Sequence, residues 1–365
     1  MCEVNAEHRL AALRLRLMDE AIDAFLVTSD ANQRYLTGFE GVIDGSGAGL
    51  CLITAAAARY YTDFRYKEVT EAAAEGTPWS VHIVRENLYI TVCDELRDNG
   101  VEALGIESSV PYGRFRFISE KFQGRVAAFD QLVEELRQVK EPVEVDAIER
   151  AAALADAAFD HVLGVIRPGM REVDVALELE SFMRRGGSEG LGFDSIVASG
   201  PNSSRPHAGV TDRVIGTGEL LTMDFGARIG GYCSDMTRTV VVGLADERQR
   251  ELYSAVLDAN MAGLAAVKPG MPGEAIDAAA RDLLRARGFG EQFGHGLGHG
   301  VGLNIHELPR VGINSRDSVR AGSVITIEPG VYVPGFGGVR IEDLVVVEEG
   351  GCRLLSHSPK GLIEL

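Results

Sequence analysis

Short apolar runs alternate with amphipathic stretches over the first 130 residues of the chain. Leucines three or four residues apart over residues 5–20 predict a first helix, because such positions share one helix face. The apolar runs predict strands at 24–28, 49–54, 79–84 and 104–107, and the stretch 66–74 predicts a further helix. Alternation of this kind favours a sheet covered by helices, so residues 1–130 are expected to form an α/β domain.

An amphipathic segment from residue 132 to residue 166 is interrupted by Pro142. Proline ends a helix and is well tolerated in the first turn of the next, so helices are expected at 132–139 and 144–166. The predicted division of the chain is therefore a first domain of residues 1–130, a linker helix at 131–141 and a second domain of residues 142–365.

The second domain contains a faint internal repeat. The run Ile166-Arg-Pro-Gly-Met170 recurs as Val267-Lys-Pro-Gly-Met271, and each copy precedes a predicted helix, at 173–185 and at 274–287. After each helix come a histidine and then a strand pair that bears two acidic residues. Two related halves packed face to face would bring four carboxylates and several histidines to a shared cleft.

The acids of the first half are Asp224 and Asp235. Asp224 ends the apolar run 220–224, where a buried carboxylate is costly unless a cation pairs with it. Asp235 follows the Gly230-Gly231 turn and precedes the predicted strand 237–242, so a hairpin would place the two acids side by side. Taken alone, a turn aspartate and a strand-end aspartate explain the pair equally well.

The acids of the second half are Glu328, at the end of the predicted strand 324–328, and Glu342, within 338–347. Glu342 is expected on the same strand face as Arg340, and an ion pair between them is the alternative interpretation. Four acids beside apolar strands in equivalent places would repel one another in a cleft unless cations neutralise them. The four together therefore indicate a metal centre.

Glycine occupies every even position from 294 to 302, around His295 and His299, and His306 follows. This pattern argues against a helical pair of zinc-binding histidines and predicts an extended strand with His295 and His299 on one face. One histidine with four carboxylates is an oxygen-rich ligand set, which favours Mn²⁺ or Co²⁺ over a thiolate-type zinc site. Two divalent ions would balance the four carboxylates and share a bridging water or hydroxide, which is typical of a hydrolase.

Composition excludes several other classes. The net charge is −18 and the 36 lysines and arginines are scattered, so nucleic-acid binding is not expected. No stretch approaches the roughly 20 apolar residues of a membrane helix, and the first residues lack the features of a signal peptide. The five cysteines show no CxxC spacing, which predicts a cytoplasmic protein without disulfides. The glycine-rich run 45–49 precedes a strand, so it is expected to be a hairpin turn rather than a dinucleotide loop.

Several motifs together resemble the Xaa-Pro peptidases of the "pita-bread" metallopeptidases, the group of prolidase and aminopeptidase P. In the second domain they are Met223-Asp-Phe-Gly-Ala227, Ser234-Asp-Met-Thr-Arg-Thr239, His295-Gly-Leu-Gly-His299, Ile327-Glu-Pro-Gly330 and Arg340-Ile-Glu-Asp343. In the first domain, the stretches 32–39 and 61–66 are similar to the family's creatinase-type N-terminal domain. The resemblance implies an α+β fold, with a pita-bread (creatinase/aminopeptidase-like) catalytic domain preceded by a smaller α/β creatinase-type domain.

The resemblance also implies the roles of individual residues. Asp235 and Glu342 would each bridge two divalent ions, with Mn or Co favoured and Zn as an alternative, and Glu328 would accept a proton from the nucleophilic water. The full set of implied metal ligands is Asp224, Asp235, His299, Glu328 and Glu342.

Four further residues match the family's substrate-binding positions. His207 and His306 would bind the scissile region and stabilise the tetrahedral intermediate, which makes them catalytic as well. His295 matches a histidine of the substrate pocket. Arg340 matches an arginine that orients the ligand network and that, in prolidases, approaches the substrate's carboxylate. Arg205 stands where an apolar residue is expected, which bears on the size and polarity of the pocket near His207.

The implied activity is removal of an N-terminal residue that precedes proline. The first interpretation is an Xaa-Pro dipeptidase, and the alternative is an aminopeptidase P that acts on longer Xaa-Pro-Xaa peptides. The distinction depends on whether a cation closes the pocket beyond proline. A methionine aminopeptidase would leave the first domain unexplained. Metal-free creatine hydrolysis and a non-enzymatic peptide-binding module both predict loss of one or more acids, whereas all five ligand positions are intact. The family also implies a homodimer in which the partner's first domain helps to close the site.

Overall fold

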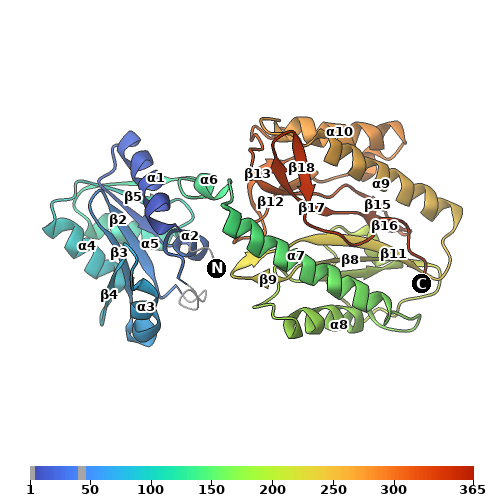
Figure 1. Cartoon of the computed structure of the whole chain (residues 1–365), viewed down its shortest axis with the longest axis horizontal. Coiled ribbons are helices and arrows are strands. Elements are labelled where there is room, and N and C mark those ends of the chain that lie inside the picture. Colours follow the sequence, from blue (N-terminus) through green and yellow to red (C-terminus); the bar gives the residue numbers. More distant parts are fainter. Residues whose placement is uncertain (1–4, 40–46) are drawn as a thin grey trace. The chain divides into compact units, whose positions relative to one another are not determined.

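The computed structural model describes residues 5–39 and 47–365. The chain forms two compact units, Met1–Arg137 and Gln138–Leu365 (Figure 1). The division lies within the segment 131–141, where a linker helix was expected. The turn predicted at 45–49 lies partly outside the described residues.

The first unit is built on a mixed six-stranded sheet in the order β4-β3-β2-β1-β5-β6. Its central strand β1 is fully buried and pairs antiparallel with β2 and parallel with β5. The strands are β1 (Ala24–Val27), β2 (Leu50–Thr54), β3 (Ala58–Thr62), β4 (Ser80–Ile83), β5 (Ala103–Glu107) and β6 (Arg125–Phe129). The helices are α1 (Ala6–Asp19), α2 (Asp30–Thr37), α3 (Lys67–Ala74), α4 (Leu88–Asp98), α5 (Tyr112–Lys121) and the short α6 (Glu134–Arg137), with a 3₁₀ turn at Phe64–Tyr66.

A buried carboxylate fixes the loop between β1 and α2. One oxygen of Glu107, at the end of β5, accepts the backbone N–H groups of Thr28 and Ser29, both at 2.7 Å. Its other oxygen accepts the side-chain amide of Asn32 at 2.8 Å. These bonds satisfy the start of α2, where backbone N–H groups have no partner within the helix.

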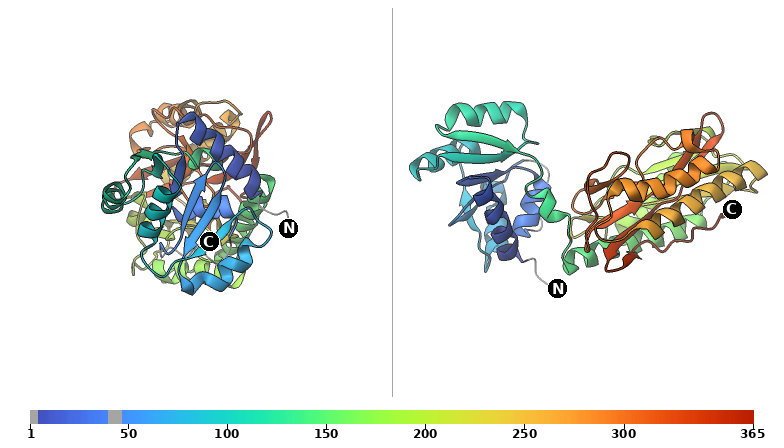
Figure 2. Two further views of the ribbon diagram at one scale, coloured as in Figure 1. Left: turned by 90° about the vertical axis from the view of Figure 1, so that its left-hand side faces the viewer. Right: turned by 90° about the horizontal axis from the view of Figure 1, so that it is seen from above.

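The second unit consists of two halves, each with a pair of helices on an antiparallel sheet (Figures 1 and 2). The first half has α7 (Pro142–Leu163), α8 (Glu172–Arg185), β7 (Ile196–Ser199), β8 (Glu219–Phe225) and β11 (Met236–Val242), with the small hairpin β9 (Arg228–Ile229) and β10 (Tyr232–Cys233). The second half has α9 (Glu247–Ala266), α10 (Gly273–Ala286) and the sheet β13-β12-β14-β17-β18, with the hairpin β15–β16 beside it. These strands are β12 (Gly298–Gly300), β13 (Glu307–Val311), β14 (Val324–Ile327), β15 (Gly330–Val333), β16 (Gly337–Arg340), β17 (Asp343–Glu348) and β18 (Gly351–Leu354), and 3₁₀ turns lie at Gly200–Ser204 and Gly290–Gln292.

The repeated Pro-Gly-Met motif occupies the same structural place in both halves. Gly169 and Gly270 both have positive φ angles, 94° and 83°, and lie in the turn between the paired helices. The N–H of Gly169 donates to the carbonyl of Ile215 at 2.9 Å, and the N–H of Gly270 donates to that of Val319 at 2.8 Å. The positive φ explains why glycine recurs at this point.

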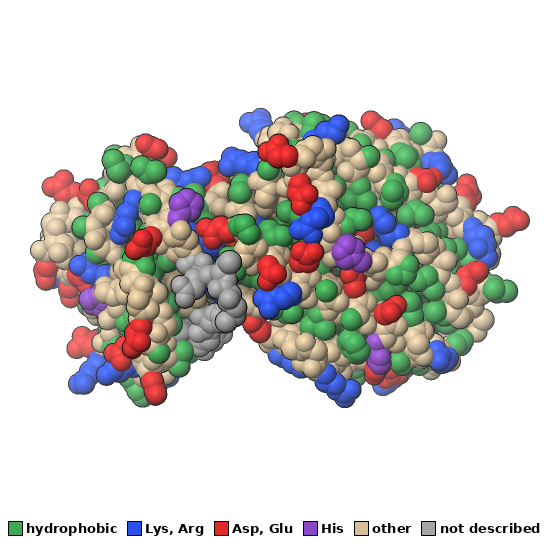
Figure 3. Space-filling view, in the orientation of Figure 1, with side chains coloured by type: hydrophobic (Ala, Val, Ile, Leu, Met, Phe, Trp, Pro, Cys, Tyr) green, Lys and Arg blue, Asp and Glu red, His purple; other side chains and the backbone are tan. Residues whose placement is uncertain are grey.

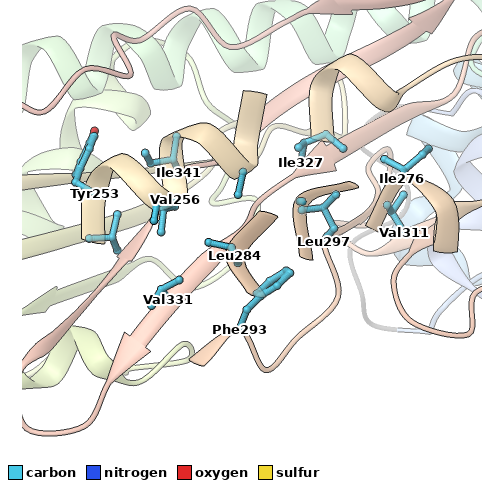
Figure 4. Packing of buried hydrophobic residues seen from close by; sticks show 14 of the residues in the cluster. Tyr253, Val256, Ile276, Leu284, Phe293, Leu297, Val311, Ile327, Val331 and Ile341 are labelled. Atoms are coloured by element: carbon cyan, nitrogen blue, oxygen red, sulfur yellow. The ribbon is translucent and has the colours of Figure 1, made fainter. Parts of the chain in front are cut away.

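Each half has its own apolar core. In the second half, buried side chains of α9 and α10 pack on the sheet and on the β15–β16 hairpin, and Figure 4 shows this cluster. Gly263 of α9 faces this core, where a methyl group in its place would lie 2.9 Å from Ile327 Cγ2. Glycine therefore lets α9 approach the end of β14 closely.

Three local predictions need correction. The helix expected at 132–139 is reduced to α6, because the chain beyond it is engaged by tertiary contacts. The side chain of Gln138 donates to the carbonyl of Ser318 at 2.9 Å, and the N–H of Lys140 donates to that of Gly322 at 2.9 Å. Such contacts override helix propensity.

The single strand expected at 338–347 is two strands in different sheets. β16 pairs with β15, whereas β17 pairs with β14, and the chain changes sheet at Ile341 and Glu342. Arg340 and Glu342 are therefore not neighbours on one strand face.

The prediction of a long extended strand around His295 and His299 is also wrong, because β12 covers only Gly298–Gly300. A methyl group at Gly298 would lie 2.0 Å from the carbonyl oxygen of Thr326, and one at Gly300 would lie 2.1 Å from that of Leu308. The glycines therefore reflect close approach of neighbouring backbone rather than a long extended strand.

Candidate metal centre and substrate cavity

A cavity of about 450 Å³ opens in the second unit between residues of its two halves. It is lined by every residue that was predicted to bind metal or substrate. These are His207, Asp224, Asp235, His295, His299, His306, Glu328, Arg340 and Glu342. The structure thus brings together side chains from distant parts of the sequence.

The carboxylates lie at strand ends. Asp224 is near the end of β8, and Asp235 directly precedes β11, which pairs with β8 so that Thr237 faces Asp224. Glu328 directly follows β14, and Glu342 lies between β16 and β17. Strand ends in both halves therefore direct acids toward one place, as the repeat predicted.

His299, on β12, presents its ring to two of these acids. Its Nε2 atom lies 3.3 Å from Glu328 Oε1 and 3.6 Å from Asp235 Oδ2. Burial lowers the pKa of His299, so the neutral ring is favoured. In that form Nδ1–H donates to the carbonyl of Gly300 at 3.0 Å, which leaves the lone pair of Nε2 among carboxylate oxygens. A bound cation would stabilise such a group of electron-rich atoms.

Two carboxylate oxygens at the centre have no hydrogen-bond partner within residues 5–39 and 47–365, although both are buried: Asp224 Oδ1 and Glu342 Oε1. The second oxygen of each group is held by the protein. Arg340 Nη2 lies 2.5 Å from Asp224 Oδ2, and the hydroxyl of Thr237 donates to Glu342 Oε2 at 2.6 Å. Arg340 therefore pairs with Asp224, and the alternative of an Arg340–Glu342 ion pair is not observed.

The electrostatics of the cluster fit divalent cations. Burial raises the pKa of Asp235 and of Glu342 well above their ordinary values, and repulsion from the neighbouring acids adds to both shifts. Burial raises the pKa of Glu328 to about 7, with Arg340 opposing the shift and Asp224 adding to it. Bound cations would reverse this penalty. Asp235, His299 and Glu342 each offer a ligand atom, and these atoms lie within 4.8 Å of one another.

A chain of hydrogen bonds orients the substrate side of the cavity. Arg340 Nη1 donates to the hydroxyl of Tyr332 at 2.8 Å, and this hydroxyl lies 3.0 Å from His295 Nε2. Burial lowers the pKa of His295 to about 4, so the ring is neutral and its Nδ1–H donates to the carbonyl of Gly296 at 2.7 Å. The tautomer follows from these partners. Arg340 Nη1 also donates to the carbonyl of Pro206 at 3.2 Å, directly before His207.

His207 and His306 are exposed on the cavity wall, and the ring of His306 lies 4.2 Å from that of His299, centroid to centroid. Arg205 is exposed, bonds to Asn202 and does not line the cavity.

Several residues of the cavity wall were not identified from the sequence. Arg310 lines the cavity from β13, and Glu307 lies beside it in a buried ion pair with Lys140. Both follow His306 closely, which is the only sequence signal that points to them. Phe193, Ile196 and Ile305 supply apolar surface.

Comparison with known families covers both units. Residues 146–349 match the model of metallopeptidase family M24, and residues 9–139 match the creatinase/prolidase N-terminal domain. The chain belongs to metallopeptidase family M24. This assignment confirms the predicted pita-bread catalytic domain behind a creatinase-type domain, and makes the chain a metallo-exopeptidase.

Relatives of the M24 chain match over its whole length. It is 37% identical over 355 residues to the Xaa-Pro dipeptidase of Pyrococcus horikoshii, covering 96% of this chain and 97% of the relative. It is similar to the solved structure of an Xaa-Pro dipeptidase from Bacillus anthracis, with a TM-score of 0.94, 40% identity, and 99% and 100% of the two chains covered. An X-Pro aminopeptidase structure from Thermotoga maritima matches with a TM-score of 0.86 and 34% identity, covering 96% and 100%.

None of the helices in the described parts of the chain is long and apolar enough to cross a membrane. Acidic and basic side chains are intermixed on the face drawn in Figure 3.

Proposed function

We propose that this protein is an Xaa-Pro dipeptidase that uses two divalent metal ions. The observation that carries the proposal is the shared cavity, in which buried, partly unsatisfied carboxylates meet the exposed cation Arg310. The carboxylates fit a dinuclear metal centre, and Arg310 fits the free carboxylate of a dipeptide that ends in proline. The match to dipeptidases of two organisms supports the same substrate class.

The residues that would hold the ions are Asp224, Asp235, His299, Glu328 and Glu342, with Asp235 and Glu342 shared between both sites. Bound ions would acidify a water molecule and polarise the scissile carbonyl. The protein contributes fixed geometry: Thr237 and Arg340 each hold one oxygen of a ligand carboxylate. Second partners of this kind orient ligands and tune their basicity.

Glu328 would take the proton of the attacking water. Its carboxylate lies at the cavity, and the hydroxyl of Thr326 donates to its Oε1 at 3.2 Å. A carboxylate that lines the cavity can accept a proton from a water molecule held beside it. His207 and His306 would donate hydrogen bonds to the scissile region, and the neutral ring of His295 would shape the pocket beside them.

Selectivity for proline would come from the pocket wall. The nitrogen of an Xaa-Pro bond carries no N–H, so a site that relies on that donor loses a hydrogen bond. Apolar surface from Phe193, Ile196 and Ile305 can instead accept the pyrrolidine ring. Cleavage of an Xaa-Pro dipeptide would use both this apolar surface for the proline ring and Arg310 for the proline carboxylate.

The alternative is an aminopeptidase P that acts on Xaa-Pro-Xaa peptides, which the similarity to the Thermotoga maritima aminopeptidase favours. Initial rates on Ala-Pro, Ala-Pro-Ala and Ala-Ala separate the two after metal stripping and reloading with Mn²⁺, Co²⁺ or Zn²⁺. Faster cleavage of Ala-Pro supports the dipeptidase, and faster cleavage of Ala-Pro-Ala supports the alternative. Absence of metal-dependent cleavage of either peptide would contradict both and favour a peptide-binding module.

We further propose Mn²⁺ or Co²⁺ as the working metal, because four carboxylates and one imidazole are hard or borderline ligands. A homodimer in the cytoplasm is the expected form. Metal analysis of the purified protein and its mass in solution test these two expectations.

A further inference from the structure

A buried asparagine lies behind the metal centre. Asn260 is in the interior of α9 and is fully shielded from solvent. Its Nδ2 atom donates to the carbonyl of Ile327 at 3.0 Å and to the carbonyl of Ile341 at 3.4 Å. These two residues directly precede Glu328 and Glu342. One side chain thus joins the two segments that carry the glutamates of the cluster.

Both carbonyls lie at strand ends in the apolar interior of the second unit. β14 ends at Ile327, and Ile341 lies between β16 and β17, outside any strand. Their side chains belong to the apolar cluster drawn in Figure 4, together with Val256 of α9. A backbone carbonyl that is buried in apolar surroundings without a donor is costly. A primary amide carries two N–H groups, which matches the two carbonyls.

The helix is close enough for this short side chain to reach. Gly263 lies three residues after Asn260 on α9, where a methyl group would be 2.9 Å from Ile327 Cγ2 and 3.1 Å from Leu297 Cδ2. Since residues three apart share a helix face, Gly263 permits the approach and Asn260 uses it.

Charged groups fix the orientation of the amide. Lys360 Nζ donates to Asn260 Oδ1 at 3.2 Å and to Asp343 Oδ2 at 2.8 Å. An ammonium group only donates, so the amide oxygen faces Lys360 and the NH₂ group faces the two carbonyls. Arg238 holds the other oxygen of Asp343 at 2.9 Å and also donates to the carbonyl of Glu342.

We propose that Asn260, oriented by Lys360, is a positioning residue for the metal pair. It fixes the distance between the backbones that carry Glu328 and Glu342, and it contacts neither substrate nor ions. The inference rests on the proposed function, since it assumes that these two glutamates bind metal. Loss of partners behind metal ligands typically weakens metal binding about 10- to 100-fold.

The test compares Asn260→Leu with Gln249→Leu, a change of the same type on the same helix. Gln249 is also buried and its amide donates to the carbonyl of Gly218 at 2.8 Å, away from the glutamates. The full-length protein is stripped of metal, and Mn²⁺ affinity is measured by competition with a fluorescent chelator. Thermal unfolding, and kcat and KM for Ala-Pro at saturating Mn²⁺, are measured alongside.

Asn260→Leu should weaken Mn²⁺ binding about 10- to 100-fold and lower kcat with little change in KM. Gln249→Leu should lower the melting temperature and leave Mn²⁺ affinity unchanged. Wild-type affinity in folded Asn260→Leu, or an equal loss in both variants, would overturn the positioning role. If Asn260→Leu does not fold, Lys360→Met decides: weaker Mn²⁺ binding supports the proposal, and unchanged binding overturns it.

Measurements on the wild-type protein distinguish failure of the proposed function from failure of the role of Asn260 alone. A wild type that binds Mn²⁺ and cleaves Ala-Pro, beside an Asn260→Leu variant that matches it, overturns only the role of Asn260. A wild type that does neither overturns the proposed function and this inference with it.

Discussion

The ammonium of Lys140 lies 3.3 Å from Glu307 Oε2, and the two side chains are only 1% and 5% exposed. The other oxygen of Glu307 accepts the N–H of Asn304 at 2.8 Å. A methyl group at Gly302 would lie 2.6 Å from the Glu307 carboxylate, so this glycine leaves room for it. The buried pair therefore holds the loop that carries His306.

Lys140→Met should destabilise the protein by about 3 kcal/mol, because removal of one partner leaves a buried charge without its counter-ion. Activity should fall as well, since the loop with His306 loses its support. Chemical denaturation measures the first effect and Ala-Pro hydrolysis the second. Lys67→Met is the control, because its pair with Glu71 is exposed and should contribute less than about 1 kcal/mol. Equal stability changes in both variants would show that the buried pair has no special role.

Asp235→Asn should abolish metal-dependent turnover and leave a folded protein. Asp235 is the proposed bridging ligand of the first half, and burial and neighbouring acids already favour its neutral form in the absence of cations. The neutral amide is therefore tolerated by the fold but cannot balance the charge of the ions. Rates with added Mn²⁺ and circular dichroism check the two parts. Full activity in this variant would rule out the dinuclear proposal.

Arg310→Leu should lower kcat/KM for Ala-Pro by about 10- to 100-fold, because a charge-assisted hydrogen bond contributes about 1.5–3 kcal/mol. Cleavage of Ala-Pro-amide, which lacks the free carboxylate, should change little. Arg205→Leu is the control, since Arg205 does not line the cavity. The same loss on both substrates would mean that Arg310 does not recognise the carboxylate.

Metal-free protein should become less stable as pH rises from about 6.5 to 8, above the range in which the lowered pKa values of His295, His299 and His306 act in the opposite direction. The pKa of Glu328 is raised to about 7, above that of an unfolded glutamate, and Asp235 and Glu342 shift in the same direction. The folded state then keeps protons that the unfolded chain has released, so its stability falls through this window. Added Mn²⁺ should remove the effect at pH 8. Melting temperatures with a chelator and with Mn²⁺ test this. Chelator-treated protein that melts at a higher temperature at pH 8 than at pH 6.5 would contradict it.

The sequence allowed much of this site to be predicted because its acids follow apolar strands. Asp224 and Glu328 lie at the ends of short apolar runs that were predicted to be strands. The repeated Pro-Gly-Met turn indicated that the second domain has two related halves. These signals are local, so a single sequence carries them. The creatinase-type domain and the M24 domain were likewise expected from motifs that the family comparison then confirmed.

Other features depend on contacts between distant segments, which local patterns do not encode. Arg310 reaches the cavity, and Tyr332 reaches Arg340 and His295, only because of how β13 and β15 pack. The break at Ile341 depends on which sheet each flanking strand joins. Glycines 298 and 300 reflect close neighbours rather than strand length.

The proposed ligand set is divided between the two halves of the second unit, with Asp224 and Asp235 on one side and His299, Glu328 and Glu342 on the other. The proposed ions would therefore act as a reversible cross-link between two structural repeats. Their binding free energy adds to the stability of the docked pair, as for any ligand that binds only the folded state. The concentration of available metal would then determine how stably the two halves of the second unit pack together, as well as whether the site is active.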